Sequence, residues 1–552
     1  MVENVIPAFA GMTKSAFSNT PLKSVDRLFF FRYFPLVPET LDLNPEFLHA
    51  LEVMEEPGAH CLITGRAGTG KSTLLEYFRS QTKIKVAVLA PTGVAAVNIR
   101  GQTIHSFFRF RTDITVETAA KTANRLRKQG KTEIYEQLDA ILIDEISMVR
   151  ADLLDCADTF LRTARRKKNV PFGGIKMIFI GDLYQLPPVV RSTERKIFAD
   201  HYPGVYFFDA HVFPQMSLTR VELEKVYRQK DAEFVRLLNA VRNNSLTDND
   251  AALFNRQFKP DFDPKNSLYV TLTAINDQAR QINTEKLASL KTKTVRYHGE
   301  VTGQFEQGTL PTDETLLLKE GAQVMLLNND PLGRWVNGTM AVITRLKTAK
   351  IVVRLETGGE EAIDPFTWNL FHYDYDSKKK TLVTENVGSF TQYPIRLAWA
   401  VTIHKSQGKT FDRVIIDVGR GTFATGQMYV ALSRCRTLEG MILKTKLLRR
   451  HVLVDYRIMK FLTGHQYAVS DEKMPLAKKI AAIEEAIEVG GALEIVYLKA
   501  CDEKSRRVIR PMEIGDMEYS GKTFLGLKAF CESRKEERHF RVDRILELSP
   551  YK

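Results

Sequence analysis

Residues 65–73 read GRAGTGKST and match the pattern GxxxxGK[ST] of phosphate-binding loops. The apolar run CLIT (61–64) precedes this stretch and LLEYFRS (74–80) follows it, so a buried strand and a helix are expected on either side. Glycines in such a loop let backbone N–H groups surround phosphates at a helix N-terminus. A chance glycine-rich turn is the alternative, and the order strand, loop, helix disfavours it.

The residues of this loop have separate expected roles. Lys71 is expected to reach the β- and γ-phosphates of a nucleoside triphosphate, and Ser72 to ligate Mg²⁺. The expected nucleotide-binding set is Gly65, Gly68, Thr69, Gly70, Lys71, Ser72 and Thr73.

ILIDE (141–145) ends another aliphatic run with two carboxylates. Ligands of open α/β sheets bind at the carboxyl ends of strands. Asp144 is therefore expected to hold Mg²⁺ and Glu145 to polarise an attacking water. Strand-end carboxylates are often merely solvated, but together with the loop they predict hydrolysis of a nucleoside triphosphate.

Short aliphatic runs recur along the chain, with helical stretches between them. They are continuous rather than alternating, which is typical of strands buried on both faces of a parallel sheet. The pattern predicts the α/β class with two parallel-sheet domains, at 40–204 and 205–463. The predicted strands are 61–64, 86–90, 140–144, 177–182, 205–209, 269–273 and 414–417.

Other segments lack this alternation of aliphatic runs and helical stretches. Residues 1–39 lack periodicity and are predicted to form a poorly ordered extension, while 292–392 is turn-rich and predicts a small β insertion. The remaining predictions are a closing helix at 447–462, a polar linker at 464–475 within a linker-and-helix segment 464–492, and a β-rich domain at 493–552.

Three further polar residues are candidates for γ-phosphate contacts. Gln185 in GDLYQLPPV (181–189) follows a predicted strand. Arg228 in KVYRQ and Arg434 in YVALSR are placed in the second α/β unit, where an arginine can act across a cleft as an arginine finger. A lone arginine is more often a surface ion-pair partner, so neither arginine is decisive alone.

Composition bounds the class of protein. The chain has 552 residues, a net charge of +13 and a pI near 9.3, which favours a polyanionic partner such as nucleic acid. The five cysteines include no CxxC pair, so neither a disulfide framework nor a zinc ribbon is expected. No apolar run reaches the roughly 18 residues of a membrane span, and a cytoplasmic protein without membrane contact is predicted.

Eight motifs in order resemble those of the PIF-family DNA helicases, the 5′-to-3′ branch of helicase superfamily 1. The resemblance covers about residues 40–462 and implies two RecA-like domains, a small β-barrel inserted in the second, and an ATP-dependent motor on single-stranded or forked DNA. The motifs are GRAGTGKST, PTGVAA (91–96), TIHSFF (103–108), IDEISMV (143–149), GDLYQLPP, KVYRQ, TIHKSQGKTFD (402–412) and YVALSRC.

The resemblance also implies roles for single residues. Lys71, Ser72, Asp144 and Glu145 match ATP and magnesium residues, and Gln185, Arg228 and Arg434 match γ-phosphate contacts. Hydroxyls, imidazoles and lysines suit contacts to the DNA backbone, although each histidine has packing as its alternative. The implied DNA-binding set is Pro91, Thr92, Thr103, His105, Ser106, His404, Lys405, Ser406 and Gly408.

Some positions depart from the family or stay ambiguous. Phe47 stands where many members carry an adenine-reading glutamine, so adenine selectivity is not assured. The family's wedge-like insert corresponds to 107–136, whose basic residues suit either DNA contact or a solvated helix face. Trp335 and Trp368 in the β insertion are expected in its core rather than as base-stacking platforms. The basic residues of the insert are Arg109, Arg111, Arg125, Arg127, Lys128 and Lys131.

The segment 493–548 resembles a WYL domain, a small β-barrel. Thr523-Phe524-Leu525 stands where the Trp-Tyr-Leu triplet that gives the family its name is expected. A ligand role that depends on the Trp and Tyr side chains is therefore in doubt. A nucleic-acid or small anionic ligand is the prediction for this domain, and internal ion pairs with Glu513 or Asp543 are the alternative. The candidate arginines are Arg507, Arg510, Arg538, Arg541 and Arg544.

The leading hypothesis is a monomeric, ATP-dependent DNA helicase that translocates 5′ to 3′ in genome maintenance. A nucleic-acid scaffold with a vestigial ATPase is the second hypothesis, and an NTP-dependent switch regulated through the C-terminal domain is the third. ATPase activity that ignores single-stranded DNA would distinguish the switch.

Overall fold

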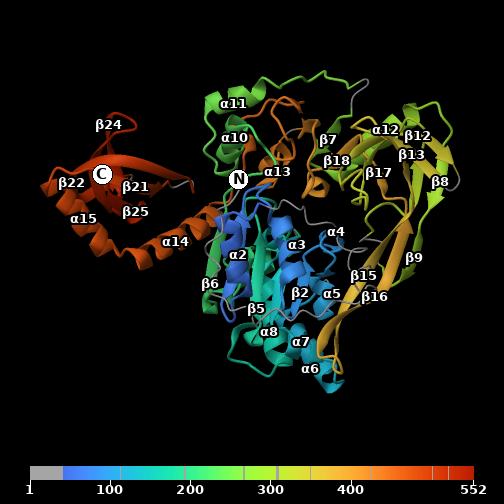
Figure 1. Ribbon diagram of the computed structural model, residues 1–552, viewed down its shortest axis with the longest axis horizontal. Helices are drawn as coiled ribbons and strands as arrows, with labels where there is room; N and C mark the ends of the chain where they lie inside the picture. Colours follow the sequence, from blue (N-terminus) through green and yellow to red (C-terminus); the bar gives the residue numbers. More distant parts are fainter. Residues whose placement is uncertain are drawn as a thin grey trace, which may run out of the picture.

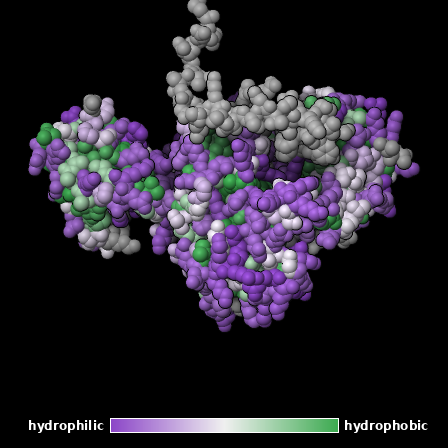
Figure 2. Space-filling view, turned by 60° about the horizontal axis from the view of Figure 1, so that its bottom comes forward, coloured by the Kyte–Doolittle hydropathy of each residue, from purple (hydrophilic) through white to green (hydrophobic). Residues whose placement is uncertain are grey.

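The computed structural model describes residues 42–551 except 112, 192–193, 265–267, 306–309, 348–349, 420, 423, 500–501 and 520. The extension expected at 1–39 lies outside these residues. Figure 1 shows a main body and, beside it, a smaller C-terminal lobe that follows helix α14 (Tyr456–Lys473). Figure 2 shows the same two lobes, with hydrophilic residues dominating this face of the main body. No helix in the described part of the chain could cross a bilayer.

The first α/β unit is built on a six-stranded parallel sheet with the order β3-β2-β4-β5-β1-β6. Alternate residues of each strand face opposite helical layers, as a sheet buried on both sides requires. Its strands are β1 (His60–Gly65), β2 (Val86–Ala90), β3 (Gln102–Thr103), β4 (Ala140–Ile143), β5 (Lys176–Gly181) and β6 (Leu218–Leu223).

Two helices cover one face of this sheet and two larger ones the other. Cys61 and Ile63 of β1 pack with α2 and α3, whereas Leu62 faces the cluster that contains α6 and α8. The helices of the unit are α2 (Pro45–Glu55), α3 (Lys71–Gln81), α4 (Gly93–Asn98), α5 (Ile104–Phe108), α6 (Val116–Lys128), α7 (Glu133–Gln137), α8 (Ala151–Ala164) and α9 (Arg195–His201).

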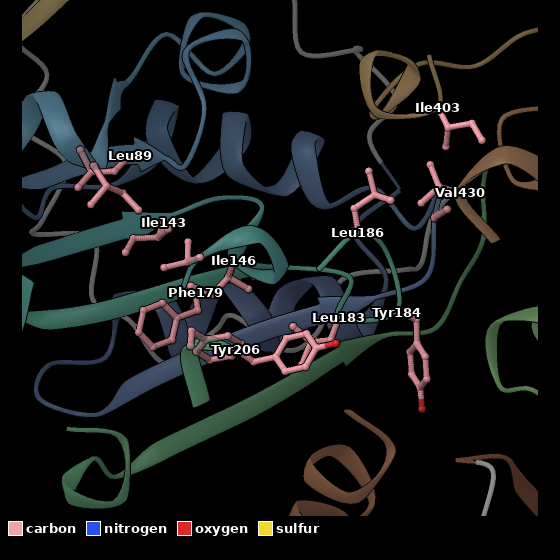
Figure 3. Packing of buried hydrophobic residues seen from close by; sticks show 14 of the residues in the cluster. Leu89, Ile143, Ile146, Phe179, Leu183, Tyr184, Leu186, Tyr206, Ile403 and Val430 are labelled. Carbon is pink, nitrogen blue, oxygen red and sulfur yellow. The ribbon is translucent and has the colours of Figure 1, made fainter. Parts of the chain in front are cut away.

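The second α/β unit has a four-stranded parallel sheet with the order β18-β7-β19-β20. Figure 3 shows Ile403 and Val430 of this unit beside Leu186 of the first, so one apolar core runs through both units. The strands are β7 (Val270–Thr273), β18 (Ala400–Thr402), β19 (Val414–Asp417) and β20 (Met441–Leu443). The helices are α10 (Ala232–Arg242), α11 (Asp248–Asn255), α12 (Asn276–Ser289) and α13 (Gln427–Leu432).

The predicted β insertion consists of antiparallel sheets between α12 and β18. Trp335 and Trp368 are both buried there, as expected for core residues. A five-stranded sheet has the order β14-β13-β12-β11-β17, a three-stranded sheet β15-β16-β9, and a pair β10-β8. The strands are β8 (Val295–His298), β9 (Glu300–Gly303), β10 (Thr315–Leu318), β11 (Gln323–Leu326), β12 (Met340–Lys347), β13 (Lys350–Leu355), β14 (Glu360–Ile363), β15 (Phe366–Asp376), β16 (Thr381–Gln392) and β17 (Ile395–Leu397).

The C-terminal domain is a five-stranded antiparallel sheet with the order β24-β23-β22-β21-β25. Helix α15 (Leu476–Glu488) buries Ile483 and Ala486 against it. The strands are β21 (Leu493–Leu498), β22 (Lys504–Tyr519), β23 (Lys522–Cys531), β24 (Glu536–Arg541) and β25 (Ile545–Pro550).

The structure corrects two predicted elements of the first unit. Strand β6 pairs with β1 along its whole length, so the first sheet extends to Leu223 and the boundary at 205 is wrong. The run VYFFD (205–209) is no strand, because its aromatic rings pack as a cluster around Phe461, and Phe207–Asp209 form a 3-10 turn. A continuous apolar run does not by itself distinguish these outcomes.

The predicted linker at 464–475 is also wrong. Helix α14 begins at Tyr456 and continues through most of this stretch to Lys473. Its first half packs on the edge strand β6, where Arg220 Nη1 donates to the Leu462 carbonyl oxygen at 2.8 Å. Its second half contacts the C-terminal domain, where the buried Ser470 donates to the Leu546 carbonyl at 2.7 Å, and Pro475 separates it from α15.

Candidate nucleotide and DNA site

The loop 65–73 joins β1 to the N-terminus of α3 and has the backbone of a phosphate cradle. Gly68 and Gly70 have φ values of 84° and 86°, a region that favours glycine. A Cβ on Gly68 would lie 2.5 Å from the Cβ of Arg228, so glycine is also required for space. Lys71 Nζ donates to the carbonyl oxygens of Gly65 and Arg66, at 2.8 Å each.

Two segments that are distant in sequence form hydrogen bonds with this loop. The Tyr227 backbone N–H donates to the Gly68 carbonyl at 2.8 Å. The Ala67 backbone N–H donates to the Tyr429 hydroxyl at 2.9 Å. The motifs KVYRQ and YVALSR are thereby brought to a loop that lies far from both of them in the sequence, as arginine fingers require.

Arg228 and Arg434 lie next to each other behind the loop. Arg228 Nη1 donates to the Ser433 carbonyl at 3.2 Å, and Arg434 is fully buried (0% exposed). Burial, and then the neighbouring Arg434, lowers the pKa of Arg228 to about 9. Two adjacent guanidinium groups beside a phosphate cradle make a site that fits the γ-phosphate.

The placement of Arg228 differs from the prediction. It follows β6 of the first sheet by five residues and precedes α10, so it belongs to the connection between the units rather than to the second unit. Only Arg434, which directly follows α13, comes from the second unit.

The two carboxylates lie at the carboxyl end of β4, as predicted. Burial raises the pKa of Asp144. Burial, together with the charge of Asp144, raises the pKa of Glu145 to about 7, against the opposing charge of Lys71. Glu145 also has a left-handed backbone with φ of 50°, at the turn that directly follows β4.

A bridge between the two units joins these groups, and sequence reasoning missed its central residue. Gln407 Nε2 donates to Glu145 Oε2 at 3.0 Å and to Gln185 Oε1 at 3.3 Å. Gln185 Nε2 donates in turn to Asp182 Oδ2 at 3.2 Å. The only signal for Gln407 was its place inside TIHKSQG, a segment predicted to contact DNA rather than ATP.

The position of Phe47 does not suit contact with a nucleotide base. Phe47 is buried in the core of α2 and packs edge-on against Tyr77, so it presents no polar edge to a base. Tyr227 is 41% exposed beside Gly70, and its hydroxyl accepts a hydrogen bond from Asn44 Nδ2 at 2.9 Å. An aromatic face is therefore available there.

The candidate DNA residues of the first unit lie at the carboxyl ends of β2 and β3. Thr92 and Thr103 are the N-cap residues of α4 and α5, and each hydroxyl accepts a backbone N–H while keeping its own proton to donate. Pro91 directly follows β2, and burial lowers the pKa of His105. Ser106 Oγ lies 3.1 Å from His372 Nε2 of β15.

The hairpin β15–β16 thus reaches back from the β insertion to this face of the first unit, where Figure 1 also shows it. Besides the Ser106 contact, the Tyr373 hydroxyl accepts from the Val88 backbone N–H at 3.1 Å. The Tyr373 backbone N–H donates to Gln102 Oε1 at 3.1 Å.

The candidates of the second unit follow β18. Lys405 and Gly408 are exposed, and Gly408 has φ of 77° with open space around it. His404 is half-buried, which lowers its pKa. Ser406 is fully buried and donates to the Ile403 carbonyl at 2.7 Å, so in this structure its hydroxyl stabilises the turn.

The basic residues of the insert 107–136 lie mostly on its outer side. Helix α6 packs Ala119, Ala123 and Leu126 against the core and leaves Arg125 and Lys128 exposed. Arg111 forms an exposed ion pair with Asp113, 3.5 Å apart. Helix α6 therefore packs through its apolar face and leaves basic side chains exposed, which suits either DNA contact or a solvated face.

In the C-terminal domain, three of the five candidate arginines pair with carboxylates of the same domain. The pairs are Arg510 with Glu532 at 2.8 Å, Arg538 with Glu536 at 2.5 Å, and Arg541 with Asp543 at 2.6 Å. Arg507 is buried and donates to Ser505 Oγ at 3.1 Å. This pairing favours the ion-pair alternative for these groups.

This chain is similar in sequence to known protein families and to individual proteins. A model described as PIF1-like helicase matches residues 46–252, and one described as WYL domain matches 478–550. The chain is 32% identical over 438 residues to the ATP-dependent DNA helicase Pif1 of Bdellovibrio bacteriovorus, which covers 76% of this chain and 92% of that protein.

Solved structures agree with the sequence comparison. The structure of Bacteroides sp Pif1 in complex with ADP-AlF4 has a TM-score of 0.70 at 34% identity and covers 77% of this chain and 97% of that one. Bacteroides Pif1 bound to ssDNA has a TM-score of 0.54 at 35% identity and covers 76% and 96%. The arrangement of this chain is closer to the first.

Proposed function

Because this chain belongs to the PIF1-like helicase family and is an ATP-dependent DNA helicase, we propose that it moves 5′ to 3′ along single-stranded DNA and opens forked duplexes. The observation that carries the proposal is the position of Gln407. It contacts Glu145 and Gln185 in the ATP site and directly adjoins the exposed segment of Lys405 and Gly408. A DNA strand that binds and displaces this segment would also move Gln407, the residue that contacts Glu145.

The residues around the loop fit ATP and Mg²⁺. Ser72 and Asp144 would hold Mg²⁺ together with the phosphates, and the ion would neutralise charge on them. Magnesium takes few protein ligands in such sites, and the phosphates supply the others. Glu145 would orient the attacking water, while Lys71, Arg228 and Arg434 would bind the γ-phosphate and stabilise the charge that develops there.

Strand displacement with tailed duplexes tests the direction. We expect the protein to release the short strand from a duplex with a 5′ single-stranded tail and not from one with a 3′ tail, in the presence of ATP and Mg²⁺. Lys71→Ala, which loses the phosphate-binding ammonium, is the matched inactive control. Release from the 3′-tailed duplex alone would reverse the proposed polarity. ATP turnover that ignores single-stranded DNA would favour the NTP-dependent switch.

The ring of Tyr227 is predicted to stack on the nucleotide base. Tyr227→Ala should raise KM for ATP and for GTP about tenfold each, because stacking contributes about 1–3 kcal/mol and every base has a π face. Steady-state kinetics with both nucleotides measure this effect. Tyr227→Phe, which keeps the ring and removes the hydroxyl that contacts Asn44, should stay near the wild type. If Tyr227→Ala raises KM for ATP but not for GTP, the tyrosine hydroxyl contacts the edge of the adenine instead of the ring stacking on the base.

Removal of the C-terminal domain is predicted to weaken strand binding only partly. Residues 493–552 hold 13 Lys and Arg against 11 Asp and Glu, so most of the net charge of +13 lies elsewhere in the chain. A truncation after Met474 keeps α14 whole, whereas a cut at 465 would divide it. The slope of log affinity against log salt should fall by about 0.7 for each phosphate that the shortened protein no longer binds. Identical affinities and slopes would reject strand binding by this domain.

A further inference from the structure

The hairpin between β21 and β22 buries an acidic residue of the C-terminal domain against the motor. Asp502, 8% exposed, accepts from the Tyr184 hydroxyl at 3.0 Å through Oδ2 and from Gln466 Nε2 at 3.1 Å through Oδ1. Its carbonyl oxygen accepts from Asn243 Nδ2 at 3.3 Å. Nearby, Lys504 Nζ lies 3.0 Å from Glu224 Oε1, so a second contact holds the same hairpin.

Tyr184 and Asn243 both contact the buried Arg242 of α10. The Arg242 guanidinium carbon lies 4.1 Å from the centre of the Tyr184 ring, and its Nη1 donates to Asn243 Oδ1 at 3.3 Å. Within the described residues, Arg242 Nε and Nη2 have no hydrogen-bond partner. The position of Arg242 therefore depends on the bond to Asn243, on charge and on ring stacking, and the stacking changes if Tyr184 moves.

Arg242 connects these residues to the ATP site. Its Nε lies 3.6 Å from Asp182 Oδ1, and both side chains are buried. Asp182 Oδ2 accepts from Gln185, which in turn accepts from Gln407, the residue that contacts Glu145. Figure 3 shows the Tyr184 ring directed away from Leu186 with its hydroxyl at the far tip. A continuous chain of contacts thus runs from the C-terminal domain to the catalytic carboxylate.

We propose that Asp502 is a positioning residue for ATP hydrolysis. It fixes Tyr184 and Asn243, which hold Arg242 against Asp182, and Asp182 orients Gln185 in the ATP site. The C-terminal domain, when docked through this hairpin, thereby keeps the water-orienting groups in place, and an undocked domain slows turnover. Small displacements of catalytic groups have large kinetic effects, so a remote contact suffices. This inference rests on the proposed roles of Glu145 and Gln185.

The backbone of Asp502 determines which variants test it. Its φ is 56°, a left-handed conformation that glycine adopts freely and asparagine tolerates. Asp502→Gly therefore removes the carboxylate without straining the turn. Asp502→Asn keeps an acceptor for Tyr184, and its amide can donate to Gln466 Oε1, which has no hydrogen-bond partner in the described part of the chain.

The experiment measures ATP turnover of the full-length protein with saturating single-stranded DNA. Asp502→Gly and Tyr184→Phe should each lower kcat about tenfold, the usual scale for groups that orient a catalytic residue, with little change in KM for ATP. Asp502→Asn should keep most of the turnover. Asp516→Ala, which removes an exposed carboxylate of β22 in the same domain, is the matched control and should match the wild type.

The double variant Asp502→Gly/Tyr184→Phe tests whether the two residues act through one contact. Its kcat should equal that of either single variant, because the second change removes nothing further. Multiplied effects would overturn the proposal, as would Asp502→Gly at wild-type or higher kcat, or Asp502→Asn as slow as Asp502→Gly. A lower melting temperature with unchanged kcat would make the contact purely structural and also overturn it. Wild-type protein that hydrolyses no ATP, or Lys71→Ala that does, would instead refute the proposed ATP site.

Discussion

Arg434→Ala is expected to lower kcat for ATP hydrolysis about 10³-fold or more, while the affinity for ATP changes much less. The guanidinium lies beside Arg228, and Arg434 directly follows α13, whose Tyr429 hydroxyl contacts the phosphate loop. Negative charge on the transferred phosphoryl group grows in the transition state, so a cation placed there lowers the barrier more than it strengthens binding. A 10³-fold loss corresponds to about 4 kcal/mol of transition-state stabilisation.

The measurement must separate chemistry from folding. Arg434 Nε donates to the Val430 carbonyl at 3.0 Å and Nη1 to the Lys409 carbonyl at 3.2 Å, so alanine leaves buried acceptors unpaired. Melting temperatures and the ATP dissociation constant are therefore measured beside single-turnover rates. Arg434→Lys keeps the charge and loses the fork geometry, and we expect an intermediate rate.

Arg228→Ala is the natural comparison. Arg228 is only half-buried and donates to a single carbonyl, that of Ser433, so its removal should disturb the fold less than loss of Arg434. Both alanine variants should be slow. If Arg434→Ala binds ATP normally and hydrolyses it at the wild-type rate, the guanidinium only stabilises the backbone to which it donates, at Val430 and Lys409.

The parts of the site predicted from sequence are those that a short stretch of chain specifies by itself. The loop 65–73 carries its glycines, lysine and serine contiguously, and the strand and helix beside it follow from local apolar runs. Asp144 and Glu145 were likewise placed by the end of their strand. Local spacing sufficed because the geometry at these positions is local.

Residues whose role depends on packing between distant segments were missed or misplaced. Gln407 faces the ATP site only because the two sheets bring β18 toward β4, and no pattern within TIHKSQG separates its role from those of its neighbours. Asp502 was one acidic residue in a turn until the fold placed it on Tyr184. Ser406 was likewise predicted without its packing, since the turn after β18 buries its side chain.

Element boundaries failed for a related reason. Strand β6 lies at the edge of the first sheet, and its alternating burial differs from the continuous apolar runs that marked the other strands. Helix α14 is polar where it leaves the motor, so this half resembled a linker although it contacts the C-terminal domain. Tertiary position, rather than local preference, determined both elements.

Glu145→Gln is expected to lower kcat by about 10²- to 10⁴-fold while ATP and single-stranded DNA still bind. Glutamine has nearly the same shape and keeps an oxygen that can accept from Gln407 Nε2, as Glu145 Oε2 does at 3.0 Å. It lacks the negative charge that orients and polarises the attacking water. Burial and the neighbouring Asp144 already disfavour the charged carboxylate, as its raised pKa of about 7 indicates, so the neutral variant should melt no lower than the wild type.

The distinguishing measurement is single-turnover hydrolysis together with the lifetime of the protein–ATP complex on single-stranded DNA. Glu145→Gln should accumulate that complex, because binding is intact and the chemical step is slow. Glu145→Ala also removes the acceptor of the Gln407 bridge. We expect this variant to hydrolyse ATP as slowly, with less stimulation by DNA, because Gln407 no longer links the segment of Lys405 and Gly408 to the ATP site. Rapid hydrolysis by Glu145→Gln would mean that another group activates the water and that the bridge through Gln407 is structural.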